Sequence, residues 1–125
     1  MTKISNEIWA VIKEYLETVK GKQAPDILRD ILEQHTEIEV FDGGVFIAID
    51  NEFDLFVLPE KRGRWRIRTI ISDYLNRMMQ KHGTIIASID ERNAPSLRLA
   101  RHFGFNEVSR NNGVIRLEKN HGRHC

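Results

Sequence analysis

Residues 57–68 read VLPEKRGRWRIR, and this stretch decides how the rest of the sequence is interpreted. The residues before it, 53–58, have the pattern of a β-strand, which Pro59 ends because proline has no N–H to donate to a ladder. After it, apolar residues recur at helical spacing up to Gly83. A helix that begins directly after a strand points unpaired N–H groups and its positive dipole end outward, which makes an anion site.

Basic side chains are concentrated in this junction, where five of the eight residues 61–68 are lysine or arginine. One interpretation is a solvated helix face. The other is an anion site, and the position of the arginines favours it, because cations at a helix start oppose the dipole and weaken the helix. Several arginines suit a pyrophosphate better than a neutral ligand.

Periodicity on both sides of the junction predicts an α/β fold, namely a single-domain mixed sheet of about six strands flanked by four helices. Asn93 is expected to cap the last helix, and Asn112-Gly113 to close a hairpin. The predicted helices are 5–21, 25–35, 64–83 and 93–104, and the predicted strands are 37–40, 45–49, 53–58, 84–89, 105–109 and 114–117.

Composition describes an ordinary globular chain of 125 residues, 41% apolar and 30% charged. Cys125 is the only cysteine, which excludes an intrachain disulfide and a zinc site built from several cysteines. No apolar run reaches the length of a membrane span, and the first residues lack the pattern of a secretory signal, so we expect a cytoplasmic protein without a membrane partner.

Charge divides the chain more sharply than the net value of +1 suggests. Residues 1–60 hold 5 basic and 13 acidic side chains, a net of −8, whereas residues 61–125 hold 14 basic and 5 acidic, a net of +9. The basic half fits an anionic partner such as nucleic acid or a phosphorylated cofactor. Attraction between the two halves within one fold is the alternative.

A second segment, residues 93–105, reads NAPSLRLARHFGF. Together with the junction it resembles the GNAT superfamily of N-acetyltransferases, which transfer acetyl from acetyl-CoA to an amine. A similar junction and Asn-to-Gly-Phe segment occur in short, divergent acetyltransferase-like proteins of tailed bacteriophages. The resemblance implies a GNAT-like domain over 1–119 and a disordered tail over 120–125. The element order agrees apart from the family's first strand, which would have to fit within residues 1–4.

Acetyl-CoA is the acyl donor that the resemblance implies, with its pyrophosphate at the start of the helix and its pantetheine arm along the preceding strand. Asn93 would contact a pantetheine amide besides capping its helix. The implied cofactor-binding residues are Phe56, Val57, Leu58, Arg62, Gly63, Arg64, Trp65, Arg66, Ile67 and Asn93.

Two departures from the family pattern bear on activity. Trp65 and Ile67 stand where the family usually has glycine, and the indole of Trp65 would either stack over the ligand or fill its cavity. Ala100 stands where many members have a tyrosine that protonates the departing thiolate. Both an active and a weak or inactive acetyltransferase therefore stay open.

The resemblance places the thioester at the splayed end of the strand before the loop. Carboxylates on this strand are therefore the candidates for a catalytic role. Glu52 or Asp54 would act as general base through a water, and a backbone N–H near Val57 would polarise the thioester carbonyl. Exposed carboxylates at a strand edge are also ordinary surface residues. No segment specifies the acceptor amine, which is either a small molecule or a protein.

The alternative to an enzyme is a GNAT-fold binding protein without the chemistry. Its basic segment 61–68, with the interleaved Trp65, would contact nucleic acid. A protein partner on the acidic helices within 7–33 is a third hypothesis. His82, His102, His121 and His124 show no metal-ligand spacing, so no metal site is expected.

Overall fold

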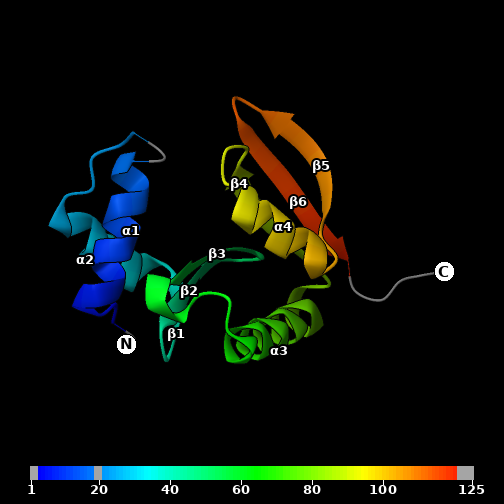
Figure 1. Cartoon of the computed structure of the whole chain (residues 1–125), viewed down its shortest axis with the longest axis horizontal. Coiled ribbons are helices and arrows are strands. Elements are labelled where there is room, and N and C mark those ends of the chain that lie inside the picture. Colours follow the sequence, from blue (N-terminus) through cyan, green and yellow to red (C-terminus); the bar gives the residue numbers. More distant parts are fainter. Residues whose placement is uncertain (1–2, 19–20, 121–125) are drawn as a thin grey trace. The chain divides into compact units, whose positions relative to one another are not determined.

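The computed structural model describes residues 3–18 and 21–120 of the chain. It contains four α-helices, one short 3-10 helix and six strands, coloured along the sequence in Figure 1. In chain order they are α1 (Asn6–Thr18), α2 (Asp26–His35), β1 (Glu37–Phe41), β2 (Gly44–Ile49), β3 (Glu52–Val57), η1 (Pro59–Lys61), α3 (Trp65–His82), β4 (Thr84–Asp90), α4 (Ala94–His102), β5 (Asn106–Asn111) and β6 (Val114–Asn120).

The chain divides into two compact units, Met1–Ile49 with Asp54–Arg64, and Asp50–Phe53 with Trp65–Cys125. The sequence analysis expected one domain over residues 1–119. The boundary between the units falls within β3 and again between Arg64 and Trp65, so the basic junction contributes residues to both.

Strand pairing confirms a mixed sheet of six strands in the order β1-β2-β3-β4-β6-β5. In the first unit β1 pairs antiparallel with β2, with Glu37 opposite Ala48. In the second unit β3 pairs parallel with β4, with Glu52 opposite Ile86, and β6 pairs antiparallel with both β4 and β5. The predicted fold class is therefore confirmed.

The core of the first unit lies between α1 and β2. Ile4, Ile8 and Ile12 are almost fully buried and meet Val45 and Ile47 of the strand. Ile4 precedes α1 in irregular structure, so the first strand expected within 1–4 is absent from the described residues 3–4. Residues 1 and 2 lie outside the described part of the chain.

The core of the second unit is formed by the inner face of α3, by β4 and by β6. Met78 and Met79 are buried, which confirms that the methionines of this stripe fill the core. Ile85 of β4 and Leu117 of β6 are fully buried. Each such side chain contributes roughly 1.5–3 kcal/mol when it leaves water.

Local signals at the turns match the structure. The Oδ1 atom of Asn93 accepts a hydrogen bond of 3.3 Å from the N–H of Ser96, which confirms the predicted cap of α4. Asn112 and Gly113 have φ angles of 53° and 79°. Two consecutive positive φ angles belong to the hairpin turn that Asn-Gly favours. The predicted disordered tail falls mainly on residues 121–125, which lie outside the described residues.

Candidate functional site

The loop after β3 is fastened to its own unit by two hydrogen bonds. The Leu58 N–H donates to the Gly43 carbonyl at 2.8 Å, and the Nε of Arg62 donates to the Val57 carbonyl at 3.0 Å. Val57 is the last residue of β3, so the guanidinium of Arg62 lies at the end of that strand. Because these bonds occupy two backbone groups of the 56–58 segment, a pantetheine arm there would share or displace the Arg62 contact.

The rest of the loop is open to solvent. Arg64 is exposed, and its Nε donates to the Glu60 carbonyl at 3.2 Å. Gly63 has a φ of +78°, and a Cβ added there would meet no atom within 4 Å. Glycine at this position is required by the backbone angle and not by crowding.

The second unit begins with the exposed start of α3. Trp65 is 77% exposed, so its indole fills no cavity within this unit. Arg66 and Arg68 are exposed as well, and the first turn contains no acidic residue. Ile67 is only 6% exposed and packs in the core. Its side chain therefore cannot contact a ligand, and only its backbone could serve the role expected for it.

Ion pairing separates the junction arginines from most other described arginines of the second half, with Arg98 as the exception that has no carboxylate partner either. Five of these others lie 2.9–3.7 Å from a carboxylate, namely Arg77, Arg92, Arg101, Arg110 and Arg116. Within residues 3–18 and 21–120, Arg62, Arg64, Arg66 and Arg68 have no carboxylate partner. These four guanidinium groups are thus available to an external anion.

The candidate catalytic carboxylates are exposed on β3. Glu52 and Asp54 alternate with the buried Phe53, so neither is held in the core. Glu52 belongs to the second unit and Asp54 to the first. Further along the strand, Phe56 and Leu58 pack their side chains against the core of the first unit, which leaves only their backbone for a ligand.

The structure shows which groups of Asn93, the N-cap of α4, and of Ala100, within α4, could take part in binding or catalysis. The cap made by Asn93 uses Oδ1, so its side-chain N–H₂ group is the part that could meet a ligand. Ala100 is buried and carries no titratable group. Its neighbours Arg101 and His102 are exposed, and Arg101 lies 3.7 Å from Glu107.

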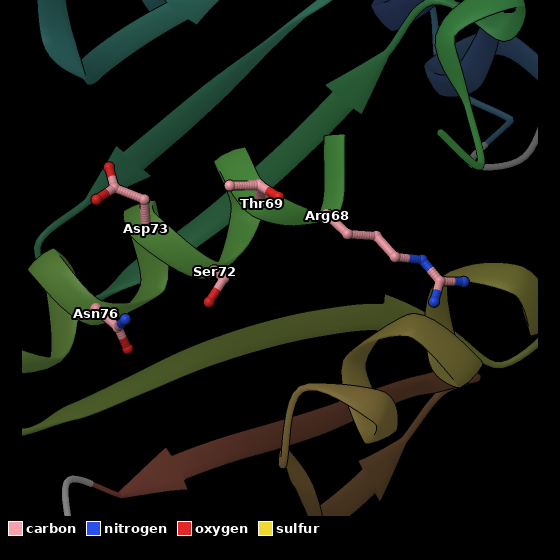
Figure 2. Close-up of a pocket in the computed structure, with 5 residues that line it drawn as sticks. All are labelled: Arg68, Thr69, Ser72, Asp73 and Asn76. Carbon is pink, nitrogen blue, oxygen red and sulfur yellow. The ribbon is translucent and has the colours of Figure 1, made fainter. Parts of the chain in front are cut away.

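Two features were missed by the sequence analysis. Asp90 at the end of β4 is buried, and its carboxylate accepts hydrogen bonds from the backbone N–H and guanidinium of Arg92 at 2.9–3.1 Å. The second feature is a hollow of about 400 Å³ on α3. Figure 2 shows its polar lining, which consists of Arg68, Thr69, Ser72, Asp73 and Asn76. The spacing of 68, 72 and 76 was the available signal, because residues four apart share a helix face.

Residues 3–18 and 21–120 hold neither a cluster of metal-ligating side chains nor a membrane-spanning helix. No group of three or more His, Cys, Asp or Glu residues there could hold a metal ion. None of the helices in this part of the chain is both long and apolar enough to cross a membrane. His121 and His124, which the sequence analysis considered, lie outside the described residues.

The order of helices and strands, with a parallel pair at the centre of a mixed sheet, is the fold of the GNAT acetyltransferases. Several solved structures share it, among them the following three. Ribosomal-protein-alanine N-acetyltransferase from Brucella melitensis has 16% identity and a TM-score of 0.67, with 90% of this chain and 91% of that chain covered. YncA from Salmonella typhimurium, solved with its cofactor acetyl-CoA, has 15% identity and a TM-score of 0.67, with 94% and 88% covered.

The third is spermidine N-acetyltransferase from Vibrio cholerae in complex with CoA and spermine, with 16% identity, a TM-score of 0.65, and 95% and 93% of the two chains covered. At such identities the likeness shows a shared fold. No protein-family model matches the chain, and no curated protein matches its sequence.

Proposed function

We propose that this protein binds acetyl-CoA and transfers the acetyl group to an amine. The observation that carries the proposal is the set of junction arginines without carboxylate partners, Arg62, Arg64, Arg66 and Arg68, at a strand-loop-helix junction of an acetyltransferase fold. A charge-assisted hydrogen bond to phosphate contributes about 1.5–3 kcal/mol, so a few of these guanidinium groups supply much of the affinity for a pyrophosphate.

The chemistry of these residues fits the nucleotide diphosphate of the donor. Arg62 and Arg64 would hold phosphate oxygens from the loop, and Gly63 leaves open space for close approach. Trp65 replaces a small residue but points into solvent. The backbone of residues 56–58 would hold the pantetheine arm, and a contact of Asn93 with that arm stays a prediction.

The donor supplies a thioester, whose carbonyl carbon is attacked by a deprotonated amine. A backbone N–H near Val57 would polarise the carbonyl oxygen. Glu52 or Asp54 would accept the amine proton through a water, since both are exposed on the strand that leads to the loop. Ala100 cannot protonate the thiolate, so the thiolate would leave as an anion and take its proton from water.

The acceptor is proposed only as an amine. The Vibrio cholerae relative was solved with spermine, and the Brucella melitensis relative is named for ribosomal-protein alanine, so polyamines and peptide N-termini are the first two classes to test. We further propose a cytoplasmic location, where acetyl-CoA is present. A bacteriophage origin stays a prediction.

A transfer assay tests the proposal. The protein is incubated with acetyl-CoA and either spermidine or an alanine-terminated peptide, and both CoA thiol release and acetylated amine are measured. We expect acceptor-dependent thiol release that falls by at least about tenfold in either Glu52→Gln or Asp54→Asn, because general bases contribute factors of this order or more. Thiol release that does not depend on any amine would contradict transfer.

Nucleic-acid binding is the second candidate, because the indole of Trp65 is exposed beside Arg66 and Arg68. Aromatic stacking and phosphate pairing together bind single strands. The affinity for an oligonucleotide would then fall steeply with log[salt], by a slope that counts several phosphates. The affinity for acetyl-CoA should fall less steeply.

A further inference from the structure

The sheet ends in two edge strands, β1 and β5, and β5 is protected against pairing with another chain. Its register with β6 shifts between Glu107 and Ser109. Arg110 of the same strand forms ion pairs with Glu107 at 3.0 Å and with Glu91 at 3.6 Å. Bulges and charged side chains are devices by which proteins keep an edge strand from accepting a further strand.

The other edge strand, β1, is regular. Its five residues pair with β2 in unbroken register, and the segment 37–41 contains no proline, lysine or arginine. Ile38 packs against the core of the first unit, whereas Val40 is 45% exposed. β1 therefore lacks the bulge and the basic side chains that protect β5.

Backbone hydrogen bonds show which residues of β1 face the free edge. The Leu58 N–H donates to the Gly43 carbonyl at 2.8 Å, so this carbonyl points away from β1. A carbonyl and the N–H of the next residue point in opposite directions across a trans peptide, and the Gly44 N–H therefore points to β1. Its partner is Phe41, which bonds inward to β2, as does every second residue before it.

The two residues in between, Ile38 and Val40, consequently direct their N–H and C=O groups away from β2. Within residues 3–18 and 21–120 these four groups have no hydrogen-bond partner. A row of unpaired backbone groups is a template for one more strand. In recognition of this kind, main-chain hydrogen bonds supply affinity and alternate side chains supply specificity.

The side chains of β1 indicate which strand fits. Glu37 and Glu39 lie two residues apart, so they project from one face of the strand, and Ile38 and Val40 project from the other. A second copy of β1, paired antiparallel over all five residues, would place Glu39 directly opposite its own counterpart, and like charges at this position are destabilising. Basic side chains opposite the glutamates are favourable instead, and β1 lies in the acidic half of the chain.

We propose that the free edge of β1 binds an extended segment of a partner protein in which basic and apolar side chains alternate. The backbone groups of Ile38 and Val40 form the hydrogen bonds. The exposed side chain of Val40 contacts an apolar residue of the segment, and the basic residues lie opposite Glu37 and Glu39. This site does not depend on acetyl transfer.

The test uses a short peptide of alternating lysine and valine, blocked at both ends and labelled with a fluorophore. We expect saturable binding in fluorescence anisotropy, with a Kd below about 1 mM. A peptide of alternating glutamate and valine is the matched control and should not bind. In amide hydrogen exchange, the N–H groups of Ile38 and Val40 should exchange rapidly in the free protein and become protected when the lysine peptide is bound.

Two substitutions at one position separate the backbone from the side chain. Val40→Pro removes an N–H that makes no bond to β2, and an edge strand tolerates proline at such a position. It should weaken peptide binding by at least about tenfold, because a donor is lost and the ring obstructs the added strand. Val40→Ala keeps the N–H and should weaken binding by less than about fivefold.

N-methylated peptides provide the same test without changing the protein. One form is methylated at the amides of its valines and the other at the amides of its lysines. Only one of these two sets of amides faces β1 in a paired strand. We therefore expect one form to lose binding and the other to retain it, whereas attraction between charges alone treats both forms alike.

Three results would overturn the inference. The first is no saturable binding of the lysine peptide to folded wild-type protein, or equal binding of the glutamate peptide. The second is binding that Val40→Pro and both methylated forms leave unchanged. The third is concentration-dependent self-association of the wild-type chain that Val40→Pro abolishes, which would make a second copy the occupant of this edge.

Discussion

The Nε of Arg62 donates a 3.0 Å hydrogen bond to the carbonyl oxygen of Val57, so the side chain caps the last residue of the strand that leads to the loop. One of the five N–H donors of the guanidinium is used in this bond. The others have no partner in the described residues. A single arginine thus bonds to the strand end and keeps its other donors for the proposed anion site.

Replacement of Arg62 by lysine separates these two roles. Arg62→Lys keeps the positive charge but loses the planar fork, so one ammonium must serve either Val57 or the phosphate. We expect the affinity for acetyl-CoA to fall by about tenfold with little change in the melting temperature. Arg98→Lys is the matched control, and an equal loss in that variant would assign the effect to general electrostatics.

Two substitutions of Asn93 test whether this helix-capping residue also contacts the ligand. Asn93→Ala removes the acceptor for the Ser96 N–H and should destabilise the protein by about 0.5–2 kcal/mol in urea unfolding. Asn93→Asp keeps the capping oxygen and loses the amide donor. Its stability should match wild type while its affinity for acetyl-CoA falls. Normal affinity in Asn93→Asp would limit the residue to capping.

Burial predicts that alanine substitutions on the neighbouring strands β6 and β5 reduce the free energy of unfolding by different amounts. Leu117 is fully buried, and Leu117→Ala should reduce the free energy of unfolding by about 2–5 kcal/mol through lost transfer energy and a cavity. Val108 on β5 is 51% exposed, and Val108→Ala should cost less than about 1 kcal/mol. Similar losses in urea denaturation would refute the assignment of this core.

Glu107 should contribute to stability in a pH-dependent way. The side chain of Arg110 donates two hydrogen bonds to it, at 3.0 and 3.2 Å, and these hold the pKa of Glu107 below its ordinary value. A lowered folded-state pKa means that the stabilisation is present above the unfolded-state pKa and is lost as the pH falls through the folded-state pKa. Wild type should therefore melt slightly higher than Glu107→Gln at pH 7.

The difference between these two melting temperatures should shrink toward zero as the pH is lowered past the folded-state pKa. The effect is small because the pair is exposed to solvent. A difference that stays constant down to strongly acid pH would show that the glutamine substitution acts through packing and not through charge.

Local signals in the sequence accounted for most of the fold. Apolar spacing located all four helices, and the Asn93 cap and the Asn112-Gly113 turn were identified correctly because both depend on nearby backbone atoms. The family's first strand is absent from residues 3–4, where Ile4 is buried in irregular structure and its N–H donates to Glu33 at 2.6 Å. Contact between residues 29 positions apart has no local pattern.

The candidate site was predictable only in part. The run of arginines at residues 61–68 marked the junction, but the sequence could not show that Arg62 bonds to Val57 or that Ile67 is turned into the core. Trp65 was left between filling and stacking, and its exposure excludes filling of a cavity within its unit. The α3 hollow was missed because polar residues on a helix usually mark a solvated face.

Calorimetric titration of acetyl-CoA into the wild-type protein and into Arg62→Ala tests the proposed acetyl-CoA site most directly, and desulfo-CoA serves as the unreactive ligand. We predict micromolar binding of both ligands to wild type, weakened by about 10-fold to 100-fold in Arg62→Ala, as expected for a lost charge-assisted bond. No heat of binding from either ligand with folded wild-type protein would contradict an acetyl-CoA site.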